Sequence, residues 1–227
     1  MAIILEKGQR INIGLSKVGV GLGWDPNEDT GSDFDLDASA FMIGDNKKIP
    51  NDDYLVFYNG EKRVLPESTL KLEPINANKY PPYKNKNGEN KTSKEHWLEK
   101  TRPVSVDFSV IGSFDDTSGN ESDGGDDETI NIDLDRVDKN ISEIILTVTI
   151  YDYESRRQNF GQVKNSYIRI FNELSGEDIA KYELDEDFSV ETAVEFGRLY
   201  RRNREWKFEA MGIGHKGGLQ YFVNKYI

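Results

Sequence analysis

The sequence predicts an all-β protein: a β-sandwich of about ten short strands, with a short C-terminal helix and a long surface insert. Many short segments alternate apolar and polar residues with the period of two that a half-buried strand shows. Others are rich in β-branched residues, which favour strands, and polar turn residues separate the segments. Helical periodicity is almost absent, and 227 residues suit a single domain that spans residues 1–227.

The expected strands follow one another along nearly the whole chain. Residues 144–151 form the clearest of them because they are rich in β-branched side chains. In residues 18–24, glycine alternates with apolar residues, which indicates a strand whose backbone is closely approached. Asn203 and Arg204 suit a hairpin turn, and an amphipathic helix is expected at residues 219–226. The other expected strands cover residues 11–15, 34–42, 54–58, 104–110, 130–134, 165–171, 179–184, 192–200 and 205–211.

Residues 74–103 interrupt this pattern with four prolines and many asparagines and lysines. Seven basic residues stand against three glutamates there, a surplus of about four positive charges in a chain whose formal net charge is −12. We interpret the segment as a long, flexible surface insert within the single domain. Its candidate partner contacts are Lys79, Lys84, Lys86, Lys91, Lys94, Lys100 and Arg102.

Composition excludes several classes of function. The net charge of −12 argues against a nucleic-acid partner, because phosphate binding needs a basic surface. The chain has no cysteine, which excludes disulfides, thiolate zinc sites and thiol nucleophiles, and it has two histidines. The N-terminal apolar run is too short for a signal peptide, and no run approaches the ~20 apolar residues of a membrane-spanning helix. We therefore expect a cytoplasmic protein.

The first of two acidic clusters spans residues 25–37, with six acids and no base. Successive side chains of a strand point to opposite faces, so Asp33, Asp35 and Asp37 should share one face while Phe34 and Leu36 enter the core. Like charges in such a row repel one another, and a divalent cation would remove that penalty.

The second acidic cluster spans residues 115–128, with seven acids and no base. Its glycines allow a loop to fold oxygen ligands around an ion, which suits the six to eight flexible ligands of Ca²⁺ better than the strict octahedron of Mg²⁺. The pattern is not an EF-hand, because Ala38 and Gly44 occupy the positions where that loop needs glycine and glutamate. Solvated acidic loops and a paired-carboxylate hydrolase remain alternatives. No nucleophile elbow or phosphate-binding loop appears in the sequence.

Several segments, in the same order, resemble the TerD family of tellurium-resistance and stress proteins. They are GLGWD (21–25), DFDLDASAF (33–41), VFYN (56–59), DDE (126–128), QNFGQV (158–163), GRLY (197–200) and EWKF (205–208). The resemblance covers residues 1–73 and 104–227, and it implies a β-sandwich that binds calcium, about two ions, through acidic loops. The ligands that it implies are Asp25, Asp33, Asp35, Asp37, Asp116, Asp123, Asp126, Asp127 and Glu128.

The resemblance also implies a non-enzymatic role in tellurite resistance, other chemical stress and phage defence. The expected partners are other tellurium-resistance operon proteins, including an integral-membrane protein, at the cytoplasmic face of the membrane. We expect a calcium-dependent scaffold. The alternatives are a calcium-dependent phospholipid-surface sensor, helped by the basic insert, and a metal-dependent hydrolase.

Overall fold

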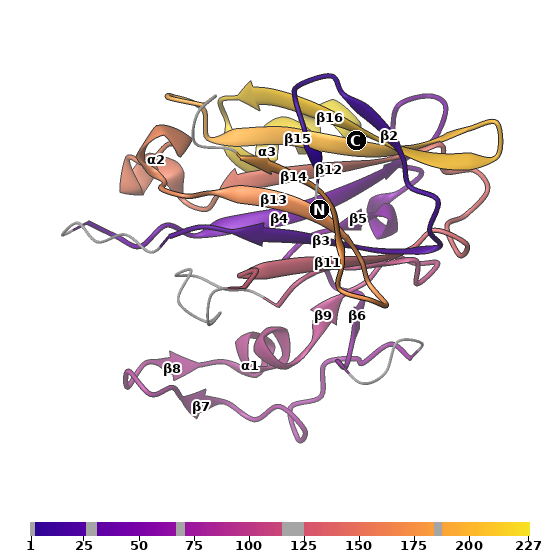
Figure 1. The fold of residues 1–227 in the computed structure, drawn as a ribbon. Helices are drawn as coiled ribbons and strands as arrows, with labels where there is room; N and C mark the ends of the chain where they lie inside the picture. The colour runs from indigo at the N-terminus through magenta and orange to yellow at the C-terminus, as the bar shows by residue number, and fades with distance from the viewer. Residues whose placement is uncertain (1–2, 26–30, 67–70, 115–124, 184–187) are drawn as a thin grey trace.

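The computed structural model describes residues 3–25, 31–66, 71–114, 125–183 and 188–227. Two six-stranded sheets pack face to face, as predicted, and a short helix follows near the C-terminus (Figure 1). Sheet A consists, in spatial order, of β1 (Ile3–Ile4), β14 (Asp178–Glu183), β13 (Tyr167–Asn172), β3 (Lys17–Gly23), β11 (Glu128–Asp133) and β10 (Val110–Ile111). Sheet B consists of β2 (Arg10–Asn12), β16 (Glu205–His215), β15 (Ala193–Arg202), β12 (Glu143–Ile150), β4 (Leu36–Ile43) and β5 (Leu55–Val56).

The main core lies between the inner faces of the two sheets. The alternation read from the sequence is visible in it: Val18, Val20 and Leu22 of β3 face inward, as do Leu36 and Ala38 of β4. Burying these side chains stabilises the sandwich by about 25 cal/mol for each Å² of apolar surface removed from water.

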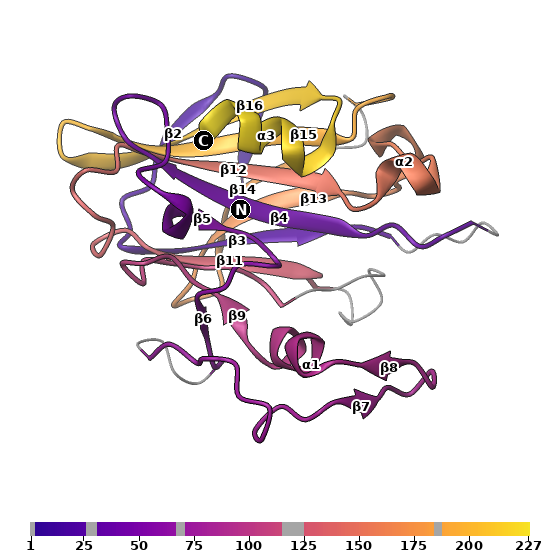
Figure 2. The same ribbon diagram turned by 180° about the vertical axis from the view of Figure 1, so that it is seen from behind.

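A second apolar cluster covers the outer face of sheet B. Helix α3 (Gly218–Tyr226), at the position predicted for the C-terminal helix, packs Phe222 and Tyr226 against Phe41 and Ile43 of β4 (Figure 2). Strand β4 is therefore buried on both faces, and every residue of it is buried. None of the three α-helices described has the length and apolar character that a bilayer crossing requires.

Glycines of β3 lie beneath side chains of its neighbours, as the alternating pattern predicted. A Cβ atom at Gly19 would lie 2.1 Å from the ring of Phe171, and one at Gly21 would lie 2.1 Å from the carboxylate of Asp126. Larger residues would push these side chains off the sheet.

The insert contains elements that the sequence did not predict. Strands β7 (Tyr83–Lys84) and β8 (Asn90–Lys91) form a hairpin, and helix α1 (Ser93–Lys100) begins with a capping box between Thr92 and Glu95. Strand β9 (Arg102–Pro103) then pairs with β6 (Arg63–Val64). Trp97 is 4% exposed and anchors the helix, because its Nε1 donates to the Glu73 carbonyl at 2.7 Å.

Three expected strands were wrong in extent. Of residues 11–15, only the first two belong to a strand, β2. Residues 104–110 contain a turn, in which the Asp107 carboxylate accepts from the backbone N–H of Ser109 and of Asp138, and Phe108 has a φ of 58°. Of residues 54–58, only β5 is a strand, and it follows the 3₁₀ helix η1 (Asp52–Tyr54). Polar side chains satisfy the backbone in the last two places and end the ladder.

Candidate metal-binding end of the sandwich

Strand ends from both sheets meet at one end of the sandwich and bring the acidic segments together. In sheet A, the first residue of β11, Glu128, pairs with Leu22 near the end of β3. In sheet B, the first residue of β4, Leu36, pairs with Ile150 at the end of β12. Helix α2 (Tyr153–Arg156) follows β12 at this same end (Figure 1). We call this region the acidic end.

The segment before β4 alternates as predicted. Phe34 and Leu36 are buried in the main core, at 5% and 0% exposure. The carboxylates of Asp35 and Asp37 lie on the other side of the strand and are nevertheless buried, at 5% and 3% exposure. Asp33 differs from them, because it is exposed.

Residues after β12 hold this acidic segment in place. Arg156 Nη2 lies 3.4 Å from Asp35 Oδ2, and Gln158 Nε2 donates to the carbonyls of Ser32 (2.8 Å) and Asp33 (3.2 Å). The sequence analysis did not assign these contacts. The available signal was a basic residue, Arg156, a few positions after the clearest expected strand. Its position in the sequence does not show that the segment of Asp35 lies beside it.

Asp127 and Glu128 link β11 to the two segments beside it. Asp127 Oδ2 accepts a hydrogen bond from the backbone N–H of Trp24 at 2.9 Å. Trp24 directly precedes Asp25 in the chain. Glu128 is 3% exposed, and its Oε2 accepts from the backbone N–H of Ala38 at 2.7 Å. A carboxylate of sheet A therefore reaches the residue that follows Asp37 in sheet B.

Asp126 has a different environment from its two neighbours. Its carboxylate accepts from Arg169 Nε at 2.8 Å and from Arg169 Nη2 at 2.7 Å, on the outer face of sheet A. This hydrogen bonding raises the pKa of Arg169. Burial, followed by the charge of Asp126, raises the pKa of Tyr167 to about 12. Asp126 thus already has a strong cationic partner.

The remaining predicted ligands are placed as follows. Asp25 accepts from the side-chain amide of Asn165, and its own N–H donates to the carbonyl of Lys164 at 3.0 Å. Asp116 and Asp123 lie outside the described residues.

The donor chemistry at the acidic end fits a hard cation. Carboxylate and carbonyl oxygens are the ligands that Ca²⁺ and Mg²⁺ prefer. Within the described ranges, no three acidic or histidine side chains converge on one point.

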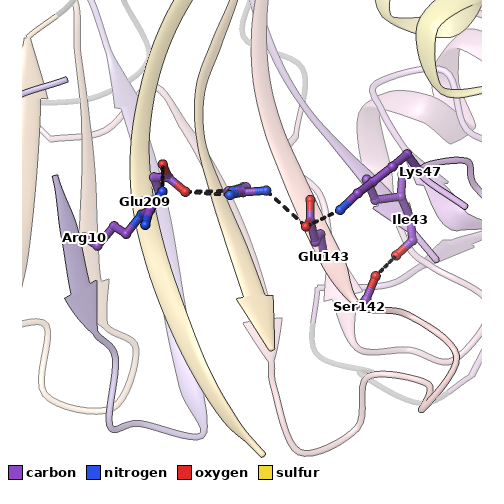
Figure 3. Close-up of polar contacts among 7 residues, drawn as sticks. Arg10, Ile43, Lys47, Ser142, Glu143 and Glu209 are labelled. Atoms are coloured by element: carbon purple, nitrogen blue, oxygen red, sulfur yellow. Dashed lines mark hydrogen bonds and ion pairs between the residues drawn. The ribbon is translucent and has the colours of Figure 1, made fainter. Parts of the chain in front are cut away.

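At the opposite end of sheet B, charged side chains are paired with one another. Arg10 and Arg198 both bind Glu209, at 2.9 and 2.7 Å, and Arg198 and Lys47 both bind Glu143, at 3.0 and 2.6 Å (Figure 3). The row crosses β2, β16, β15 and β12, so each charge faces its opposite on the next strand. At the acidic end, Arg156 is the basic side chain beside Asp35.

Fold and site together define a two-sheet β-sandwich with buried carboxylates gathered at one end. Residues 1–74 and 101–226 match the family model described as the TerD domain, so the chain belongs to the TerD family. The match leaves most of the insert uncovered.

Relatives of known name agree with this assignment. The chain is 39% identical to general stress protein 16U of Bacillus subtilis, over 100% of this chain and 97% of the relative. It is 38% identical to the tellurium resistance protein TerD of Serratia marcescens, over 99% of both. A solved structure, described as a homologue of telluride resistance protein (TerD) from Streptomyces coelicolor A3(2), aligns with a TM-score of 0.57 at 16% identity over 92% of this chain and 96% of that one, which shows the shared fold. This is a family of tellurium- and stress-resistance proteins.

Proposed function

We propose that this chain is a calcium-binding, non-enzymatic module of a bacterial chemical-stress resistance system, acting as a calcium-dependent scaffold. The observation that carries the proposal is the burial, at the acidic end, of carboxylates from both sheets. Asp37 comes from sheet B, Asp35 lies directly before its strand β4, and Glu128 comes from sheet A; each is at most 5% exposed.

Burial makes these negative charges costly unless a cation balances them. An ionised carboxylate taken out of water loses several kcal/mol of solvation. Calcium would offset that loss, and its flexible coordination allows carboxylates, backbone carbonyls and water to share one ion. Asp35, Asp37, Asp127 and Glu128 are the described residues best disposed to supply ligands, whereas Asp126 is held by Arg169.

The proposed role is binding because, among the described residues, no acid–base pair is distinguished from the candidate ligands. A hydrolase needs a base and an acid whose environments push their pKa values apart. The relatives cited above are named for general stress and for tellurium resistance, and not for a reaction.

We place the scaffold in the cytoplasm, at the inner face of the membrane, with other tellurium-resistance proteins and an integral-membrane protein as partners. If the chain instead senses phospholipid directly, it should pellet with anionic vesicles in calcium but not in chelator, and removal of residues 74–103 should abolish pelleting.

The test is isothermal calorimetry of calcium into chelator-stripped protein, with magnesium as the comparison ion. We expect calcium-selective binding in the wild type and its loss in the double variant Asp35→Asn/Asp127→Asn. Asparagine at position 127 keeps an oxygen that can accept from the Trp24 N–H, so this hydrogen bond is preserved.

A matched control removes the same charge elsewhere. Asp45 and Asp135 are exposed and follow the far ends of β4 and β11. The variant Asp45→Asn/Asp135→Asn should bind calcium as the wild type does. Equal loss in both double variants, or no calcium binding by the wild type, would refute the site.

A further inference from the structure

A cavity of 340 Å³ lies between the turn that follows β12 and the first turn of α3. Asp37 lines it, so the cavity borders the acidic end. Its volume is at the lower limit of the roughly 300–1,000 Å³ of ligand pockets, which suits a single side chain or a small amine.

Three tyrosines, Tyr58, Tyr151 and Tyr153, line this cavity. The rings of Tyr58 and Tyr151 are nearly perpendicular, at 85°, with centroids 5.9 Å apart. Tyr153 packs closely on the start of α3, since a Cβ atom at Gly218 would lie 2.9 Å from its ring. Aromatic faces carry negative potential and attract cations within about 6 Å of the ring centre.

The charged groups of the cavity are all acidic. Asp37 is buried, whereas Asp152 and Glu154 are exposed at the rim. None of the described lining residues is basic. The guanidinium of Arg156 already lies 5.4 Å from the centre of the Tyr151 ring, so this wall accepts such a group within the chain itself.

The N-terminal end of α3 does not turn the cavity into an anion site. The N–H groups of Gly217 and Gly218 donate to Thr192 Oγ1, at 3.1 and 3.4 Å, and are therefore in use. An anion would also meet Asp37 and the rim carboxylates. The chemistry of the walls favours a positive ligand.

We propose that this cavity binds the cationic side chain of a partner protein, an arginine or lysine that inserts beside the tyrosine rings toward Asp37. The inference rests on the proposed scaffold function and names the chemistry of the partner. The ring faces hold the planar or aliphatic part of the side chain, and Asp152 and Glu154 attract its charge at the rim.

The test is titration of the ¹⁵N-labelled full chain with N-acetyl-arginine amide in chelator, monitored by amide shifts in NMR spectra. Working without calcium keeps this result independent of the calcium proposal. We expect saturable shifts centred on Tyr151, Gly217 and Gly218. The neutral isostere N-acetyl-citrulline amide should produce no saturable shift.

Two variants separate the charge from the rings. Asp152→Asn/Glu154→Gln should weaken arginine binding by about threefold to tenfold, as expected for two exposed charge pairs, and asparagine tolerates the left-handed backbone of Asp152 (φ 48°). Tyr151→Leu, which keeps an apolar wall without a ring face, should weaken arginine binding as well.

The control Asp45→Asn/Glu177→Gln removes two exposed acids elsewhere and should leave arginine binding unchanged. Equal shifts with citrulline, shifts spread over the acidic surface, or unaltered affinity in both cavity variants would overturn the proposal.

Discussion

At the scale of single residues, the three consecutive acids of the DDE segment have three different environments. Asp126 forms an ion pair with Arg169. Asp127 accepts a hydrogen bond from the Trp24 N–H, and Glu128 accepts one from the Ala38 N–H of the other sheet. The sequence grouped them as equivalent ligands because spacing does not reveal which neighbour each carboxylate meets. The structure makes them separable by substitution.

Asp126→Asn should destabilise the protein without changing the number of calcium ions bound. The Asp126 side chain is 5% exposed, so loss of its charge-assisted bonds to Arg169 should lower the free energy of unfolding by about 1–3 kcal/mol. Urea unfolding measures this change. Asp178, the other carboxylate at Arg169, is 40% exposed, so Asp178→Asn should have a smaller effect. A loss of calcium binding in Asp126→Asn would return Asp126 to the ligands.

Gly21→Ala should displace that same ion pair. The new Cβ would lie 2.1 Å from Asp126, and we expect a loss of about 1–3 kcal/mol in unfolding free energy, as for other overpacked sites. Gly125→Ala is the matched control, because a Cβ there would meet nothing within 4 Å. Equal stability of the two variants in urea would show that Asp126 moves aside at no cost.

At the scale of elements, the insert illustrates what composition conceals. Its prolines and lysines indicated a flexible segment. Arg63 lies outside the insert, is 1% exposed, and forms hydrogen bonds with the insert. Arg63 donates to the carbonyls of Leu98 and Thr101, at 3.0 and 2.7 Å, and to the Tyr58 carbonyl at 2.7 Å. Backbone acceptors such as these leave no signal in the sequence.

Arg63→Met should release helix α1 from the sandwich. Methionine fills much of the space but leaves buried carbonyls without a donor, so local opening should become more frequent. We expect cleavage by trypsin within residues 84–100 to accelerate on the order of tenfold. Lys62→Met, at a more exposed neighbour, should be cleaved at the wild-type rate. Identical rates in the two variants would mean that β6 and Trp97 are sufficient to hold the insert.

Helix α3 should make stability depend on pH through His215. This ring stacks on Tyr221, with centroids 4.1 Å apart, beside the fully buried Glu195 and its partner Lys225. Burial lowers the pKa of His215, and this outweighs the opposing charge of Glu195. The unfolded chain, with an ordinary histidine pKa of about 6.5, then binds the proton more readily than the folded chain.

The stability that neutral His215 contributes is therefore present above about pH 6.5 and is lost as the pH falls below it. Melting temperatures recorded from pH 7.5 to 5 should fall less steeply in His215→Gln than in the wild type. His96→Gln removes the other histidine of the chain and should keep the wild-type slope. A His215→Gln curve parallel to the wild type would contradict this role.

At the scale of the whole molecule, the sequence predicted the sandwich and the inward face of its central strands, because burial imposes alternation on each strand by itself. The strand order within the sheets was not predictable, since pairing joins β3 with β11 and β13, far along the chain. The same limit applies to the site. The alternation placed Asp35 and Asp37 on one face, but only the meeting of the two sheets brings Glu128 beside Ala38.

Because candidate ligands come from both sheets, calcium should act on the stability of the entire sandwich. An ion that binds only the folded chain stabilises it by RT ln(1 + [L]/Kd), about 2.7 kcal/mol at a hundredfold excess over Kd. For a chain of this size, that corresponds to a rise of about 5–10 °C in melting temperature.

Glu128→Gln retains an acceptor for the Ala38 N–H but removes the charge, so it should lose most of the rise. Asp45→Asn/Asp135→Asn should retain it. If calcium raised the melting temperature of Glu128→Gln as much as that of the wild type, the ion would be held by one sheet alone.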